Sequence, residues 1–133
     1  MKHGTVLVVD DDANIRQALR RVLSPRIAAV LLAENADAAQ TLIDQHRISV
    51  AVIDEKMPGR SGLDLLSDIH AKHPGIRCVL LTGWAPHHKV AQALKDKRIC
   101  AFFRKPWDDE ELVACVEELL DAVTAQEMID SQK

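Results

Sequence analysis

The chain has 133 residues, of which 47% are hydrophobic and 28% are charged, a balance typical of one globular domain and not of a disordered chain. Seventeen basic and twenty acidic residues give a net charge of −3. This argues against direct nucleic-acid binding, because domains that bind nucleic acid usually carry a basic surplus. No apolar run approaches the roughly 18 residues of a membrane span, and three acids at 10–12 end the first run too early for a signal peptide. We therefore expect a cytoplasmic protein.

The first part of the chain alternates short apolar runs with amphipathic stretches. Residues 5–9 (TVLVV) form a β-branched run, which is typical of a strand covered on both faces. Residues 13–23 have helical spacing of apolar side chains, and one of the preceding acids can cap this helix. Residues 27–33 predict a second strand, and residues 36–46 predict a second helix.

The middle of the chain repeats the alternation. Residues 48–53 predict a third strand that ends at Asp54, and a loop containing Pro and Gly follows it. Residues 63–73 predict a helix, and residues 76–81 predict a fourth strand that ends at Thr82.

The last part adds a helix, a strand and a final helix. The helix over residues 86–95 should bury Val90, Ala91 and Leu94, and residues 99–103 should form the fifth strand. Four acids at 108–111 begin the final helix, where they complement the positive end of its dipole. Because the apolar stripe of that helix weakens after Val123, we expect one domain over residues 1–123 and a helical extension or linker over residues 124–133.

Five strands and five helices in strict alternation predict an α/β fold, with one parallel sheet and helices on both of its faces. Polar side chains follow four of these strands: Asp10 and Asp11, Asp54, Thr82, and Lys105. Ligands of such folds bind outside the carboxyl ends of the strands. We therefore expect these five side chains to line one cleft.

The side chains expected in this cleft suit phosphoryl transfer. Three carboxylates repel one another unless they hold a proton or a cation, and hard oxygen ligands favour Mg²⁺. One carboxylate can then attack phosphorus, while the metal ion, Lys105 and Thr82 hold the transferred oxygens. Gly83, directly after Thr82, leaves room for an incoming phosphoryl group.

Four segments together resemble the receiver domain of two-component response regulators, the CheY-like superfamily: VLVVDDD at 6–12, VIDEKMPGRSGLDLL at 52–66, VLLTG at 79–83 and FFRKPW at 102–107. The resemblance covers residues 5–123. It implies a flavodoxin-like, doubly wound five-stranded parallel sheet in the order 2-1-3-4-5 with five helices.

The resemblance also implies a function in a two-component phosphorelay. The chain would be a stand-alone or excised signalling domain, not an enzyme, that accepts a phosphoryl group from a sensor histidine kinase. It would then signal to an output domain or protein through the face made by the fourth helix, fifth strand and fifth helix. A dimer that depends on phosphorylation is a further expectation.

The resemblance assigns roles to individual residues. Asp54 would be the phosphoacceptor and a metal ligand, Asp11 would bind Mg²⁺ directly, and Asp10 would bind it through water. The remaining assignments are the backbone carbonyl of Lys56 as a metal ligand, Thr82, Gly83 and Lys105 around the phosphoryl group, Phe102 as an aromatic switch that turns inward, and Lys105–Pro106 as a cis peptide bond.

Some positions depart from the commonest pattern of the family. Phe102 stands where Tyr is frequent, and Lys56 and Trp84 lie two residues after the acceptor and the threonine. A cation and a bulky indole at these positions predict slow self-dephosphorylation. The segments LTGWA at 81–85 and KPWDDEEL at 105–112 are similar to receivers linked to cyclic-di-GMP phosphodiesterase-type outputs.

Two alternatives from other functional classes stay open. A phosphatase of the haloacid dehalogenase type would use Asp10 as its nucleophile with Asp12, Thr82 and Lys105, but Asp54 would then have no role. A protein-binding module independent of phosphorylation would present the face made by the fourth helix, fifth strand and fifth helix in one fixed state.

Overall fold

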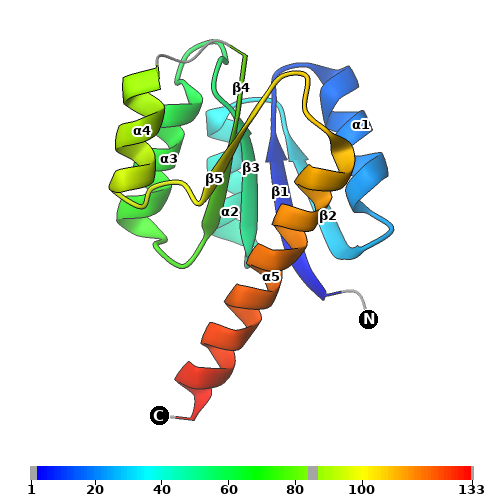
Figure 1. Cartoon of the computed structure of the whole chain (residues 1–133), viewed down its shortest axis with the longest axis vertical. Coiled ribbons are helices and arrows are strands. Elements are labelled where there is room, and N and C mark those ends of the chain that lie inside the picture. The colour runs from blue at the N-terminus through cyan, green and yellow to red at the C-terminus, as the bar shows by residue number, and fades with distance from the viewer. Residues whose placement is uncertain (1–2, 84–86, 133) are drawn as a thin grey trace.

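The computed structural model describes residues 3–83 and 87–132, which form a parallel sheet between two layers of helices (Figure 1). The strands are β1 (His3–Val9), β2 (Ile27–Ala33), β3 (Val50–Asp54), β4 (Arg77–Thr82) and β5 (Ala101–Arg104). The helices are α1 (Ala13–Leu23), α2 (Ala36–Gln45), α3 (Gly62–Lys72), α4 (His87–Lys95) and α5 (Asp109–Ser131). The strand order β2-β1-β3-β4-β5 confirms the doubly wound, flavodoxin-like fold.

The two faces of the sheet bury separate apolar clusters. Leu7 and Val9 of β1 pack in the cluster beneath α2, α3 and α4. Val6 and Val8 of the same strand pack in the cluster beneath α1 and α5. Because successive side chains of a strand point to opposite faces, both helix layers require apolar partners. This requirement explains the unbroken apolar runs of the inner strands.

The fifth strand begins later than predicted, at Ala101 instead of residue 99. The N–H groups of Arg98 and Ile99 donate to the Ala93 carbonyl, at 2.9 and 3.4 Å, and so they close the end of α4 instead of joining the sheet. Lys97 adopts a positive φ of 62° in this turn. The turn is the left-handed helix end that usually contains glycine.

The predicted inner face of α4 is wrong in part. Val90 is buried as predicted, but its buried partner is Ala93, while Ala91 is exposed and Leu94 is 37% exposed. The helix lies towards the edge of the sheet (Figure 1). Only a narrow i, i+3 stripe, made of Val90 and Ala93, meets the core there. Apolar spacing alone overestimates how much of such a helix is buried.

Helix α5 continues as one helix to Ser131, and its last turns project beyond the sheet (Figure 1). Residues 124–132 are exposed, with Met128 and Ile129 at 60% and 55%. An ion pair between Arg47 and Glu127 ties this extension to the rest of the fold. The domain boundary after Val123 stays a prediction. Within the described ranges, no helix has the length and apolarity needed to cross a membrane.

Candidate functional site

Three carboxylates gather at the carboxyl ends of β1 and β3. Asp10 is fully buried and Asp54 is 2% exposed, whereas Asp11 is exposed at the mouth of the site. Each carboxylate offers an oxygen within 4.8 Å of an oxygen from the other two. We call Asp10, Asp11 and Asp54 the acid cluster. The parallel sheet creates it by ending β1 and β3 side by side, as the sequence predicts.

Lys105 reaches into the acid cluster from the end of β5. Its Nζ lies 2.8 Å from Asp54 Oδ1 and 3.9 Å from Asp10 Oδ2. The backbone fixes this position, because the Lys105 N–H donates to the Thr82 carbonyl at 3.0 Å. The Lys105–Pro106 peptide bond is cis. One ammonium group therefore faces two buried carboxylates.

Burial strongly affects the protonation of the cluster. Removal from water raises the pKa of Asp10 from 3.8 to about 6. The hydrogen bond from the Asp12 N–H and the charge of Lys105 lower this pKa, whereas the nearby charge of Asp54 raises it further. Burial likewise raises the pKa of Asp54, although the hydrogen bond from Lys105 opposes it. For Lys105, burial lowers the pKa, but the hydrogen bond and charge of Asp54 outweigh it and the pKa lies above its usual value. The single ammonium group of Lys105 therefore does not fully neutralise the carboxylates of the acid cluster.

The donor set fits a hard divalent cation. Asp10 Oδ1 accepts the Asp12 N–H at 2.9 Å, but Asp10 Oδ2 is buried with no hydrogen-bond partner among the described residues. An unsatisfied buried carboxylate oxygen is costly. Three converging carboxylates with such an oxygen match the ligands that Mg²⁺ takes in proteins.

The other residues predicted for the site lie in or directly after β3, β4 and β5. Thr82 ends β4 and is 4% exposed. Gly83 follows it, and a Cβ added there would lie 3.9 Å from the Lys105 side chain, which is an ordinary contact. Lys56 is exposed in the loop after β3. Phe102 lies on β5 with its side chain 40% exposed. Trp84 and Pro86 lie outside the described residues.

Sequence reasoning missed two residues that shape the loop between β3 and α3. A Cβ at Gly62 would collide with the Asp54 carbonyl oxygen, so only glycine allows α3 to begin against the backbone of Asp54. Glu55 Oε2 accepts the Leu63 N–H at 3.1 Å and so anchors the first turn of α3. The Gly-containing loop after Asp54 signalled a turn, but sequence could not show that α3 packs back against this backbone.

Asp12 has a different role from its two neighbours. Its side chain accepts the Asn14 N–H at 2.8 Å and caps α1. Its carboxylate is exposed and is not part of the acid cluster. A phosphatase of the haloacid dehalogenase type would need Asp12 in the reacting site, so the geometry disfavours that alternative.

Comparison with known proteins agrees with this architecture. The family model of the response regulator receiver domain matches residues 6–117. The hydrogenase transcriptional regulatory protein HoxA of Cupriavidus necator is 31% identical over 121 residues, which is 91% of this chain and 25% of HoxA. The DNA-binding transcriptional regulator NtrC of Salmonella typhimurium is 32% identical over 96% of this chain and 27% of its own length. The chain thus spans about a quarter of the length of these relatives.

Solved structures show the same fold. The signal receiver domain of an HD domain-containing protein from Pseudomonas fluorescens Pf-5 superposes with a TM-score of 0.87 at 28% identity, covering 93% of this chain and 99% of that one. A CheY-like response regulator receiver domain protein from Methanospirillum hungatei also gives 0.87, at 26% identity, covering 94% and 99%. With the family model matched across the sheet and the acid cluster, the chain belongs to the receiver domains of two-component response regulators.

Proposed function

We propose that Asp54 of this receiver accepts a phosphoryl group from a sensor histidine kinase. The observation that carries the proposal is the placement of the Asp54 carboxylate, which is almost fully buried, held by Lys105 at 2.8 Å and adjacent to Asp10 and Asp11. A carboxylate oxygen of Asp54 attacks phosphorus. The new O–P bond forms as the P–N bond of a phosphohistidine breaks, and its electron pair goes to the imidazole nitrogen. Positioning and charge stabilisation suffice for such a transfer.

The acid cluster would hold Mg²⁺ for this reaction. Asp11 and Asp54 would bind the ion directly and Asp10 would bind it through water, with the backbone carbonyl of Lys56 as a further ligand. The support is the convergence of the three carboxylates and the unsatisfied Asp10 Oδ2. When bound, the ion supplies positive charge to phosphoryl oxygens.

Lys105 and Thr82 would hold the transferred oxygens. The Lys105 ammonium already lies 2.8 Å from Asp54 Oδ1, and a small shift of its flexible chain would let it pair with a phosphoryl oxygen. The hydroxyl of Thr82 would bind another oxygen, beside the open backbone of Gly83.

Phosphorylation of Asp54 would be signalled to an output through the face formed by α4, β5 and α5. Phe102 is 40% exposed on β5 and Leu94 is 37% exposed on α4, so both offer apolar surface in this state. Movement of Thr82 towards the phosphoryl group would open space for Phe102 to turn inward. The partner is an output domain or protein. A cyclic-di-GMP phosphodiesterase-type output stays a prediction, as does the absence of direct nucleic-acid contact by this chain itself.

The test is phosphoryl transfer from acetyl phosphate in the presence of Mg²⁺, followed by mass measurement and mapping of the labelled aspartate. We expect label on Asp54, no labelling of Asp54→Asn, and slower labelling of Asp11→Asn because one metal ligand is lost. Label on Asp10, or retention of label by Asp54→Asn, would contradict the proposal and favour the phosphatase alternative. Asp12→Asn is the matched control, because it changes an acid outside the cluster.

The label should be slow to disappear. Lys56 is exposed two residues after Asp54, where its side chain can shield the acyl phosphate from water. We expect Lys56→Ala to shorten the lifetime of the label. Loss of label from the unmodified chain within seconds would contradict this expectation.

Partner binding that is unchanged by beryllofluoride would instead support a module independent of phosphorylation.

A further inference from the structure

The backbone at the end of β1 is held by a side chain of α1. Asp10 directly follows β1 and is fully buried. Its N–H donates to the Ala33 carbonyl of β2 at 3.1 Å, and its carbonyl oxygen accepts from Arg16 Nη1 at 2.7 Å. A buried carbonyl needs a partner, and a charged donor gives a shorter and stronger hydrogen bond than a neutral one.

Arg16 occupies a position in α1 where a positive charge is unfavourable by itself. It is the fourth residue of the helix, and the first turn holds no acidic residue. The positive end of the helix dipole lies at this end, so a cation gains no stability from it. In the described part of the chain, Arg16 forms no ion pair and makes no other side-chain hydrogen bond. The Asp10 carbonyl is therefore the contact that explains this side chain.

The hydrogen bond from Arg16 closes the short turn that carries Asp10 and Asp11. Asp11 lies between Asp10, which is held at its backbone, and Asp12, which caps α1 by accepting the Asn14 N–H at 2.8 Å. Asp10 Oδ1 accepts the Asp12 N–H at 2.9 Å across the same turn. The peptide plane after Asp10 cannot rotate without breaking the hydrogen bond from Arg16. The directions of both carboxylates depend on that plane.

We propose that Arg16 is a positioning residue for the metal: by holding the Asp10 carbonyl, it keeps Asp10 and Asp11 where they bind Mg²⁺. This inference rests on the proposed metal site in the acid cluster. A hydrogen bond behind a ligand strengthens a metal site, because it orients the ligand before the ion arrives. The charge of Arg16 acts in the opposite direction, since a nearby cation repels Mg²⁺. The sign of the change in Mg²⁺ affinity therefore distinguishes positioning from charge.

The first test is the dissociation constant of Mg²⁺, measured by calorimetry on the 133-residue chain. Arg16→Met keeps an unbranched side chain of high helix propensity and should raise this constant about tenfold. Loss of the charge alone would lower it. Arg16→Lys keeps the charge and a donor group without the planar fork. It should therefore raise the constant by a smaller factor, and it keeps the test valid if Arg16→Met does not fold. An unchanged or lower constant in either folded variant overturns the proposal.

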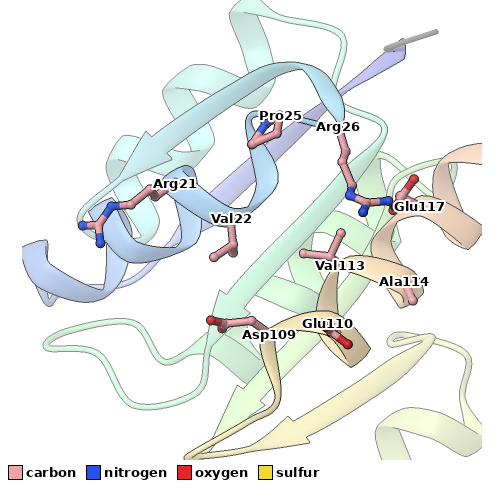
Figure 2. Close-up of a pocket in the computed structure, with 9 residues that line it drawn as sticks. All are labelled: Arg21, Val22, Pro25, Arg26, Asp109, Glu110, Val113, Ala114 and Glu117. Atoms are coloured by element: carbon pink, nitrogen blue, oxygen red, sulfur yellow. Dashed lines mark hydrogen bonds and ion pairs between the residues drawn. The ribbon is translucent and has the colours of Figure 1, made fainter.

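The matched control is Arg21→Met, which removes an exposed arginine from the same helix. Arg21 lines a groove between α1 and α5 (Figure 2), and no residue of the acid cluster lines that groove. The control should bind Mg²⁺ as the unmodified chain does. A rise in its dissociation constant equal to that of Arg16→Met would overturn the proposal, because the effect would then not come from the contact with Asp10.

The second test needs no metal. In the presence of a chelator, the amide hydrogen of Asp12 should exchange faster in Arg16→Met than in Arg21→Met, because the turn that holds this N–H on Asp10 Oδ1 is looser. The amides of β3 should exchange equally in both variants, which excludes general unfolding as the cause. Equal exchange at Asp12 overturns the proposal.

Labelling of Asp54 by acetyl phosphate separates this inference from the proposed function. At saturating Mg²⁺, Arg16→Met should take label as fast as the unmodified chain, and it should be slower only at low Mg²⁺. If the unmodified chain neither binds Mg²⁺ nor takes label, the proposed metal site is wrong and this inference is wrong with it. If the unmodified chain does both and Arg16→Met binds Mg²⁺ equally well, only this inference is overturned.

Discussion

The buried Asp10 carboxyl group should lower the stability of the fold when it is ionised. Its pKa rises from 3.8 to about 6 because the folded chain removes it from water. One pKa unit corresponds to about 1.4 kcal/mol, so the ionised side chain destabilises the metal-free fold by at most about 3 kcal/mol. Replacing Asp10 with Asn removes the charge while keeping the oxygen that accepts the Asp12 N–H.

The sign of this effect follows from proton linkage. The folded chain holds the Asp10 proton more tightly than the unfolded chain does. The stabilisation that comes from binding this proton is therefore fully present below pH 3.8 and is lost as the pH rises through about 6. Asp10→Asn should therefore match the unmodified chain near pH 4. At about pH 8 it should be more stable by at most about 3 kcal/mol, or roughly 10 °C in Tm.

The assay is urea unfolding of both chains across this pH range in the presence of a chelator. Asp11→Asn is the control, since that side chain is exposed and its removal relieves only the weakest of the contributions to Asp10. Added Mg²⁺ should narrow the difference by stabilising the unmodified chain more than the variant. A difference that does not depend on pH, or a variant that is less stable at pH 8, would refute the reasoning.

Three further predictions come from other parts of the structure. Gly62→Ala should lower the free energy of unfolding by about 1–3 kcal/mol and slow the labelling of Asp54, because the new Cβ collides with the Asp54 carbonyl. The control is Gly75→Ala, whose Cβ would meet nothing within 4 Å. It should change neither the stability in urea nor the labelling rate. Lys97→Gly should raise the free energy of unfolding by about 0.5–1 kcal/mol, because Lys97 has a φ of 62°; no gain on urea titration would contradict the strain. Cys100 is exposed, whereas the other two cysteines are buried or half-buried. A thiol reagent should therefore show one fast phase that Cys100→Ser removes, and persistence of that phase would count against the assigned exposure.

The α/β alternation and the convergence of the site residues were predictable from sequence. Asp10, Asp54 and Lys105 each follow an apolar run, and parallel strands bring their carboxyl ends to one edge whatever the packing details. The bounds of α1 and β2 were also predictable, because Asp12 caps α1 and turn residues separate it from the apolar run of β2. Local chemistry and chain connectivity determine these features.

Tertiary contacts decided the remaining features. Spacing placed Leu94 inside, but the sheet edge leaves α4 only a narrow buried stripe, so Leu94 is partly exposed. The requirement for glycine at position 62 exists only because α3 begins against the Asp54 carbonyl. Helices α1 and α5, more than eighty residues apart in sequence, pack over one apolar cluster on the same face of the sheet. Sequence periodicity records which side chains avoid water, while the distance between two elements depends on how their side chains interlock.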